Sequence, residues 1–262
     1  MENVSNTQPA EPVLEAREIG KYFGDRQVLK GINLGIEAGK TTVILGASGS
    51  GKSTLLGHLI GQHQPDQGEI LYRGMPLAGM SEDELDGYRR DFGMLFQNGA
   101  LFASMSVLEN VALPIREHPD NRLAEDTIRI MVKLKLEQVG LSGVEDLMPS
   151  QLSGGMRKRV GLARALALDP EILFCDEPRA GLDPIAGNMI DELIINLVRR
   201  LNITSVVVTH DLASAYNIGD KLALLHEGKI VVEAPPEKLR HSSDPYVQRF
   251  IHSTPDELRP TV

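Results

Sequence analysis

Apolar and polar residues alternate in the first third of the chain, whereas apolar residues form nearly continuous runs further on. The segments VLEAREIG, GINLGIEAG and EILYRG have apolar residues at roughly every second position, which is typical of antiparallel strands. The runs TTVILG (41–46), EILFCDE (171–177) and TSVVVTH (204–210) are almost uninterrupted. Such runs are typical of parallel strands with helices on both faces. The pattern predicts an α/β fold with a parallel core sheet and an antiparallel β subdomain.

Between Gln97 and Leu168 the spacing of apolar residues changes to three and four positions. The segments VLENVALPIREH, LAEDTIRIMVKLKLEQVG and GGMRKRVGLARALAL show this spacing, which is typical of amphipathic helices. We therefore expect a mostly helical subdomain at about residues 98–168, inserted between two halves of the sheet. Further on, LALLHEGKIVVEA predicts a hairpin that turns at Glu227 and Gly228.

These patterns predict one main domain, residues 13–240, with short ends of different character. Residues 1–12 are polar and contain two prolines, which predicts a flexible tail. The C-terminal extension, residues 241–262, is too short to be a domain. It carries an apolar patch, and we expect this patch to contact a neighbouring subunit of a dimer. The patch consists of Tyr246, Val247, Phe250 and Ile251.

The composition is that of a globular protein and restricts its partners. Of the 262 residues, 42% are hydrophobic and 24% are charged, and the formal net charge is -9. An acidic protein of this kind repels nucleic acid. No run approaches the roughly 18 apolar residues of a membrane-spanning helix, and the N-terminus lacks the layout of a signal peptide, so we expect a cytoplasmic protein. The single cysteine, Cys175, is expected to pack inside a strand.

A glycine-rich loop follows the first apolar run. GASGSGKST comes directly after TTVIL and before LLGHLI, which is the strand, loop and helix order of a phosphate-binding loop. Backbone amides and a helix N-terminus attract phosphates there. Lys52 is expected to reach the β- and γ-phosphates of ATP, and the Ser53 hydroxyl to bind Mg²⁺. The residues expected to contact ATP are Gly46, Ser48, Gly49, Gly51, Lys52, Ser53 and Thr54.

Acidic and imidazole side chains end the other two apolar runs. ILFCDEP places Asp176 and Glu177 side by side, and a metal ion with its water would reduce their mutual repulsion. We expect Asp176 to hold Mg²⁺ through water and Glu177 to polarise the attacking water. His210 ends the run TSVVVTH, where an imidazole can donate a hydrogen bond to a γ-phosphate oxygen.

The segment LSGGMRKRVGLARALALDPEILFCDEP, 152–178, resembles the signature sequence and second nucleotide motif of ABC ATPases. Ser153, Gly154 and Gly155 stand at the start of an amphipathic helix, whose amides and positive end form a second anion site. A phosphate loop cannot be covered by the distant signature of its own chain, so we expect a head-to-tail homodimer with two-fold symmetry. The resemblance implies the P-loop NTPase fold of this family, with a RecA-like parallel core.

Three further positions take a role from the same resemblance. AGLDP resembles the D-loop, with Asp183 at the dimer seam, and Gln97 matches the Q-loop glutamine that contacts Mg²⁺ or water. Phe23, in KYFGD, is the candidate for the aromatic ring that stacks on adenine. Tyr22 is the alternative, and simple strand packing of these rings remains a third interpretation.

The signature departs from the family pattern at one position. Met156 stands where the family has glutamine, which removes one polar contact and leaves the glycine amides intact. The neighbouring Arg157, Lys158 and Arg159 form the one compact basic cluster. In the light of the resemblance we expect them on the solvated, nucleotide-facing side of the signature helix.

The segment QNGALFASMSVLENVALPIREH, 97–118, bears on the type of ABC ATPase. Apolar residues crowd the region after Gln97, where family members receive a short coupling helix of a permease, and an apolar groove there would dock such a helix. The alternative is that they are ordinary core. These residues are Ala100, Leu101, Phe102, Met105 and Val107.

The sequences GALF, SMSVLENVA and PIREH in that segment resemble those of ATPases that work with MCE proteins in phospholipid transport. One example is the ATPase of the maintenance-of-lipid-asymmetry (Mla) system of Gram-negative bacteria. The resemblance implies a permease dimer, an MCE hexamer and a STAS-domain protein as partners at the cytoplasmic face of the inner membrane. Alternatives are a transporter for amino acids or another small solute, a soluble non-transport ABC ATPase, and a catalytically silent scaffold. The last is disfavoured by the intact Lys52, Glu177 and His210.

Overall fold

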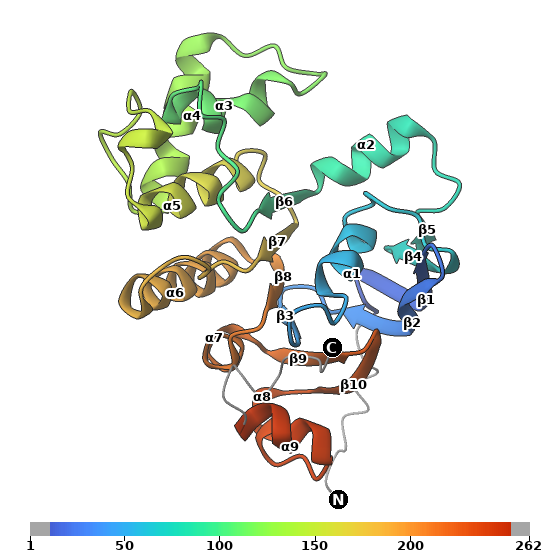
Figure 1. The fold of residues 1–262 in the computed structure, drawn as a ribbon. Helices are drawn as coiled ribbons and strands as arrows, with labels where there is room; N and C mark the ends of the chain where they lie inside the picture. The colour runs from blue at the N-terminus through green and yellow to red at the C-terminus, as the bar shows by residue number, and fades with distance from the viewer. Residues whose placement is uncertain (1–10, 253–262) are drawn as a thin grey trace, which may run out of the picture.

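The computed structural model describes residues 11–252, whose strands form two sheets (Figure 1). The first sheet is antiparallel, with the strand order β2-β1-β4-β5. It confirms the strands expected from period-two alternation, since one face of each strand packs on the core and the other meets solvent. Its strands are β1 (Leu14–Phe23), β2 (Arg26–Ile36), β4 (Gln67–Tyr72) and β5 (Met75–Pro76).

The second sheet has the order β10-β9-β3-β8-β7-β6, and all neighbouring pairs are parallel except β9 with β10. The antiparallel pair is the expected hairpin, and it turns at Glu227 and Gly228, both with positive φ. The three uninterrupted apolar runs are its central strands. The strands are β3 (Thr41–Leu45), β6 (Phe92–Leu95), β7 (Ile172–Asp176), β8 (Thr204–Thr209), β9 (Lys221–His226) and β10 (Lys229–Ala234).

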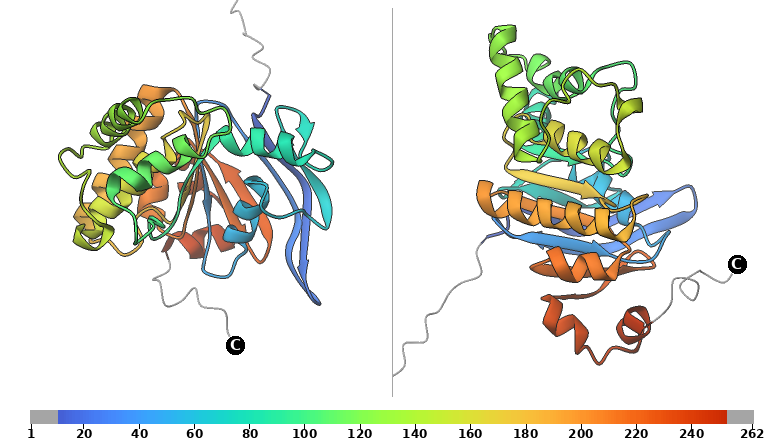
Figure 2. Two further views of the ribbon diagram at one scale, coloured as in Figure 1. Left: turned by 90° about the horizontal axis from the view of Figure 1, so that it is seen from above. Right: turned by 90° about the vertical axis from the view of Figure 1, so that its left-hand side faces the viewer.

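Helices cover one face of this larger sheet, and the antiparallel sheet lies on the other side (Figure 2). Helices α3 to α5 occupy the interval in which helical spacing was expected. No helix of the described part, residues 11–252, is long and apolar enough to cross a membrane. The helices are α1 (Lys52–Leu59), α2 (Glu82–Arg90), α3 (Val107–Arg116), α4 (Glu125–Gln138), η1 (Pro149–Gln151), α5 (Gly154–Ala165), α6 (Pro184–Leu201), α7 (Leu212–Ile218), α8 (Pro236–Arg240) and α9 (Pro245–His252).

Alternate residues of the central strands belong to two different hydrophobic cores. Val43 and Cys175 face the core shared with α3 to α6, whereas Ile44 and Phe174 face the core shared with α1 and the antiparallel sheet. Successive side chains of a strand point to opposite faces, so a strand buried on both faces must be apolar at every position. Cys175 is buried in its strand as expected.

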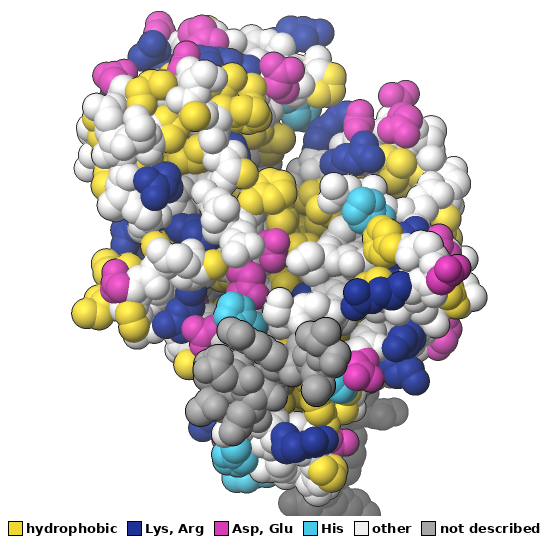
Figure 3. Space-filling view, in the orientation of Figure 1, with side chains coloured by type: hydrophobic (Ala, Val, Ile, Leu, Met, Phe, Trp, Pro, Cys, Tyr) yellow, Lys and Arg dark blue, Asp and Glu magenta, His cyan; other side chains and the backbone are white. Residues whose placement is uncertain are grey.

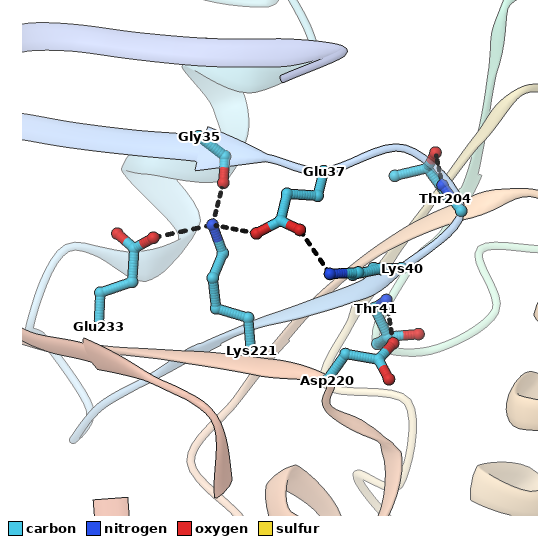
Figure 4. Close-up of polar contacts among 9 residues, drawn as sticks. Gly35, Glu37, Lys40, Thr41, Thr204, Asp220, Lys221 and Glu233 are labelled. Carbon is cyan, nitrogen blue, oxygen red and sulfur yellow. Dashed lines mark hydrogen bonds and ion pairs between the residues drawn. The ribbon is translucent and has the colours of Figure 1, made fainter. Parts of the chain in front are cut away.

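Polar contacts hold the edge of the larger sheet where its parallel strands begin (Figure 4). Lys221, at the start of β9, donates to the carbonyl of Gly35 and lies 2.8 Å from a carboxylate oxygen of Glu233. The Thr41 amide donates to an Asp220 carboxylate oxygen at 2.8 Å. Because these contacts lie at the amino ends of the strands, the loops at the carboxyl ends form the opposite edge.

The C-terminal patch differs from the expectation. Val247 and Phe250 of α9 are buried in the larger core of the same chain, and the Tyr246 ring stacks on His226 with 3.7 Å between ring centroids. Val247 and Phe250 therefore offer almost no surface to a neighbouring subunit, whereas Tyr246 and Ile251 are half-buried, and a dimer contact through these two residues stays a prediction. Most of the expected tail, residues 1–10, and the end of the extension, residues 253–262, lie outside the described residues.

Candidate nucleotide site

Four neighbouring parallel strands bring the expected phosphate and magnesium residues to one edge of the sheet. Strand β8 lies between β3 and β7, with Leu45 paired to Thr209 and Asp176 to Val208. Strand β6 pairs with β7 on the far side. The loops that follow these strands carry the phosphate loop, the adjacent carboxylates, His210 and Gln97. Parallel α/β sheets bind ligands beyond the carboxyl ends of their strands.

The phosphate loop, residues 46–54, closes back on itself through Lys52. This lysine is the first residue of α1, and its ammonium donates to the Gly46 and Ala47 carbonyls at 2.8 and 3.0 Å. Burial lowers the pKa of the Lys52 ammonium, while the nearby Glu177 and Asp176 carboxylates oppose this shift. The first amides of α1 have no helical carbonyl partner, so the loop offers amides and one cation to an anion.

Two glycines of this loop are required by its shape. A Cβ at Gly46 would lie 2.3 Å from the Leu225 carbonyl oxygen. Gly51 caps α1 with φ of 108°, a conformation that other residues rarely adopt. Ser48, Gly49 and Ser53 are exposed. The exposed side of the loop is therefore the side on which a ligand can bind.

The carboxylate of Glu177 is held in place by two neighbours at the end of β8. One oxygen lies 2.9 Å from His210 Nδ1, and the other accepts a hydrogen bond from the Thr209 hydroxyl at 3.1 Å. Glu177 itself has a φ of 44°, in the left-handed region that is uncommon for a residue with a side chain. An unusual backbone conformation of this kind is a feature of functional sites.

Asp176, beside this group, is the second carboxylate of the site. It is half-buried, and burial is the main cause that raises the pKa of its carboxyl, with repulsion by Glu177 adding to it. The ammonium groups of Lys52 and Lys158 oppose that rise. Two carboxylates and two ammonium groups thus share one partly buried edge of the sheet.

Lys158 and Thr209 are neighbours of the site that sequence reasoning missed. Lys158 is 4% exposed, and its ammonium donates to the Gln97 carbonyl and, at 3.2 Å, to the Glu177 carbonyl. The prediction that Lys158 is solvated is therefore wrong, because α5 turns this residue inward, whereas Arg157 is exposed as expected and Arg159 is half-buried. The one signal was the position of Lys158 four residues before the buried Leu162, on the same helix face.

The signature residues and Asp183 share a second hollow. Ser153 caps α5 by accepting a hydrogen bond from the Met156 amide at 3.2 Å, and Asp183 caps α6 by accepting from the Ala186 amide at 2.9 Å. Both caps, with Gly154, Gly155 and Met156, line a cavity of about 430 Å³. None of the described residues that line it comes from the phosphate loop. The described part of one chain thus presents two separate candidate surfaces for an anion.

The pattern of the ABC transporter family matches residues 29–180. The chain belongs to the ABC transporter family. Among its relatives, the intermembrane phospholipid transport system ATP-binding protein MlaF of Haemophilus influenzae is 45% identical over 244 residues, 93% of this chain and 92% of that protein. The probable ribonucleotide transport ATP-binding protein mkl of Mycobacterium leprae is 41% identical over 244 residues, 93% of this chain and 70% of that protein.

A solved structure confirms the fold class. The ATP-binding cassette MJ0796, a dimer in a post-hydrolysis state with bound ADP and Pi, has a TM-score of 0.77 and 33% sequence identity. The match covers 85% of this chain and 98% of that one. The chain is therefore an ABC ATPase with the P-loop NTPase fold, as the motifs indicated.

The two candidates for the adenine contact of this ABC ATPase both lie at the end of β1. Phe23 is 54% exposed and Tyr22 is 40% exposed. Neither ring belongs to a hydrophobic core, so strand packing does not account for them. The Tyr22 amide donates to an Asp66 carboxylate oxygen at 2.6 Å, which fixes the backbone at this point. Phe23, as the more exposed ring, stays the candidate.

The apolar region after Gln97 divides between groove and core. A groove of about 640 Å³ lies between α2 and β6 on one side and α3 and α5 on the other, and Ala100 and Phe102 line it. Figure 3 shows hydrophobic side chains in the hollow between the parts that carry α2 and α3. Phe102 is 50% exposed, whereas Val107 is fully buried. The groove interpretation therefore holds for Phe102 and the core interpretation for Val107.

Proposed function

We propose that this ABC ATPase powers phospholipid transport from the cytoplasmic face of the inner membrane. Its partners would be a second copy of the chain, a permease dimer, an MCE-protein hexamer and a STAS-domain protein. The observation that carries the proposal is the 45% identity, over 93% of this chain, to the ATP-binding protein of an intermembrane phospholipid transport system. The sequence 97–118, which forms part of the groove, supports the same subtype.

The hydrolytic step of the proposal uses the edge described above. The phosphate loop and Lys52 bind the phosphates, and Glu177 accepts a hydrogen bond from the attacking water and takes up its proton. The oxygen of that water bonds to the γ-phosphorus while the bond to the β–γ bridging oxygen breaks. His210 Nδ1 lies 2.9 Å from a carboxylate oxygen of Glu177, and the imidazole would donate a hydrogen bond to a γ-phosphate oxygen.

Mg²⁺ fits the donor atoms of this edge. The proposed ligands, Ser53, Asp176 and Gln97, supply hydroxyl, carboxylate and amide oxygens, which are the hard donors that Mg²⁺ prefers. Among residues 11–252 no group of three or more His, Cys, Asp or Glu side chains could hold a metal ion. Mg²⁺ bound through few protein groups, water and phosphate is typical of nucleotide enzymes, where the ion neutralises phosphate charge.

The second anion-binding surface gives the proposed dimer its geometry. Ser153, Gly154 and Gly155 would cover the γ-phosphate held by the other chain, with Asp183 at the seam. In a dimer with two-fold symmetry, the phosphate loop of each chain faces the signature of the other, so a single interface forms two nucleotide sites. Met156 lines the same hollow, where its side chain adds apolar contact in place of the family's glutamine.

The groove is the proposed site for a coupling helix of the permease. Its apolar lining, with Phe92, Phe96 and Phe102, suits the apolar face of an amphipathic helix. Arg164 and Glu117 also line it and would give such a helix charged contacts. The cargo itself would pass through the membrane partners, so no residue of this chain needs to recognise it.

The first experiment tests the catalytic assignment. Lys52→Ala is expected to abolish ATP hydrolysis, since it removes the cation of the phosphate loop. Glu177→Gln is expected to retain ATP and accumulate a closed dimer, because binding is intact and water activation is lost. Release of phosphate and size-exclusion chromatography with light scattering measure the two effects. Wild-type turnover in either variant contradicts the site.

The second experiment tests the transport assignment. The full-length chain, isolated from native membranes, is expected to bring a permease and an MCE protein with it, and Phe102→Asp is expected to reduce the recovered permease at least fivefold. Mass spectrometry of the co-isolated proteins measures both. An amino-acid or nucleotide permease in their place would show another cargo, and a chain recovered without any membrane protein would favour a non-transport ATPase.

A further inference from the structure

Helix α5 holds the main chain of the segment that follows β6. The ammonium of Lys158 donates to the Gln97 carbonyl, and the Arg164 guanidinium donates to the Gly99 and Ala100 carbonyls at 2.9 and 2.7 Å. A Cβ at Gly161 would lie 3.1 Å from the Gly99 Cα, so helix and segment are in direct contact. Residues 97–100, called the Q-loop segment below, therefore cannot move far without α5.

The same ammonium also holds the backbone of Glu177. Lys158 donates to the Glu177 carbonyl at 3.2 Å, and the Glu177 amide donates to the Val208 carbonyl at 2.8 Å. The residue between these two bonds has a φ of 44°. A side-chain-bearing residue in the left-handed region persists only where its surroundings determine it. The Glu177 carbonyl also accepts a hydrogen bond from the Ala180 amide at 3.0 Å, so among the described residues Lys158 makes one of three hydrogen bonds to the Glu177 backbone.

A buried lysine is a costly way to make these two hydrogen bonds. Burial of an ammonium is unfavourable unless it is paired, and burial lowers the pKa of Lys158, while Cys175, Asp176 and Glu177 act in the opposite direction. A methionine or leucine could fill the same space without this cost. What the ammonium adds is several donors on one flexible stem, which can reach carbonyls from the ends of two different strands.

The two carbonyls belong to parts of the molecule with different proposed tasks. The Q-loop segment leads from Gln97 into the groove, which Ala100 and Arg164 line, and Glu177 is the proposed base. Helix α5 begins beside Ser153, whose proposed contact is the nucleotide of the other chain. Lys158 is thus the point at which the groove, the signature helix and the base meet.

We propose that Lys158 is a positioning residue for ATP hydrolysis, which fixes the backbone of Glu177 and links it to the Q-loop segment. An occupant of the groove that shifts Ala100 or Arg164 then displaces the Lys158 ammonium and with it the carboxylate of Glu177. This inference rests on the proposed role of Glu177. It adds a residue that acts through the backbone of Glu177 and not on the proposed attacking water.

The test compares three substitutions in the transporter complex that is isolated with the full-length chain. Lys158→Met removes the donors at similar volume, Lys158→Gln keeps a shorter, neutral donor, and Lys158→Arg keeps the charge. Lys133→Met, at an exposed lysine of α4, is the matched control. The measurements are kcat and KM for ATP, the melting temperature, and backbone hydrogen exchange of residues 96–102.

We expect kcat of Lys158→Met to fall at least tenfold, with KM for ATP within threefold of wild type, because the phosphate loop is untouched. Exchange of residues 96–102 should become faster, since the hydrogen bond that holds the Gln97 carbonyl is lost. Lys158→Arg and Lys158→Gln should recover part of kcat, with Lys158→Gln at least threefold below wild type. Lys133→Met should match wild type in every measurement.

Three results would overturn the inference: wild-type kcat in Lys158→Met, a parallel loss of ATP affinity and kcat, or unchanged hydrogen exchange of residues 96–102. If Lys158→Met does not fold, Lys158→Gln decides by the same criteria, and wild-type kcat in that variant overturns the inference. Glu177→Gln separates the two proposals. Wild-type turnover in Glu177→Gln refutes the assigned base, whereas an inactive Glu177→Gln beside a fully active Lys158→Met refutes only the role of Lys158.

Discussion

The buried residue His58 shows how single contacts decide a protonation state. Its side chain is fully buried in α1, and Nδ1 lies 2.8 Å from the His63 carbonyl. A carbonyl only accepts, so Nδ1 carries the proton. Nε2 is buried without a hydrogen-bond partner among the described residues, so a second proton there would be an uncompensated charge. Burial accordingly lowers the pKa of His58, although the contact with His63 opposes the shift.

This histidine is expected to make the protein less stable in mild acid. The pKa of His58 in the folded chain lies below the usual 6.5. In mild acid the unfolded chain therefore binds a proton that the folded chain does not, and stability is lost as the pH falls below 6.5. His58→Asn keeps a donor for the His63 carbonyl and cannot titrate. Urea unfolding at pH 7.5 and 5.5 should show a smaller loss of stability in this variant than in the wild type.

The exposed His241 provides the control. His241→Gln is expected to keep the pH dependence of the wild type, because an exposed imidazole is solvated in both states. An equal loss of stability at pH 5.5 in His58→Asn and wild type would show that other groups cause the acid sensitivity.

At the scale of elements, the contact between β6 and α5 leaves no room for a side chain. A Cβ at Gly93 of β6 would lie 2.0 Å from the Ala165 carbonyl oxygen at the end of α5. The strand thus approaches the last turn of the helix through a glycine. Gly87, in α2, differs, since a Cβ there would meet no atom of the described residues within 4 Å. Gly93 therefore permits close packing of β6 on α5, whereas Gly87 only weakens its helix.

The same substitution at these two positions is expected to have opposite effects. Gly93→Ala should lower the free energy of unfolding by about 1–3 kcal/mol, since the backbone must shift to relieve the clash. Gly87→Ala should raise it by about 0.5–1 kcal/mol, because alanine is the better helix former. Thermal or urea unfolding of both variants measures the difference. An unchanged or raised free energy of unfolding in Gly93→Ala would show that the packing of β6 on α5 is not tight in solution, and a lowered one in Gly87→Ala would contradict the expected gain in helix stability.

At the scale of the whole molecule, the phosphate loop and the signature hollow, the two candidate anion-binding surfaces, share no lining residue among residues 11–252. The phosphate loop follows β3 at the carboxyl edge of the sheet, and the signature hollow lies between α5 and α6. Figure 1 shows α1 and α5 in different parts of the molecule. A nucleotide gripped by both surfaces therefore needs two chains, which is the dimer proposed above.

Mixing two inactive variants is expected to restore hydrolysis. Lys52→Ala lacks a working phosphate loop, and Ser153→Arg blocks the signature, so each homodimer is inactive. A mixed dimer has one intact site, with Lys52 from one chain and Ser153 from the other, and random pairing predicts about a quarter of wild-type activity. Phosphate release from the equimolar mixture measures it. No activity in the mixture, at concentrations where the wild type is dimeric, would mean that each site is built within one chain.

The sequence by itself determined the strands, the helical interval and the family. The spacing of apolar residues predicts strands and helices because it depends only on the local geometry of the backbone. The family followed from short motifs and their order along the sequence: the phosphate loop, the signature, and the pair Asp176 and Glu177. The sequence also predicted that these motifs lie together, because parallel strands place their carboxyl ends at one edge of the sheet. The exact contacts of the site residues with nucleotide stay a prediction.

Only the tertiary structure decided what surrounds each side chain. Lys158 was predicted to be solvated, but it is buried against two carbonyls. Phe102 and Val107 belong to the same apolar segment, but Phe102 lines the groove and Val107 lies in the core. Val247 and Phe250 were predicted to contact another subunit, but they pack on their own chain. In each case the neighbours come from distant parts of the sequence. A residue's burial is set by those long-range contacts, which no local spacing encodes.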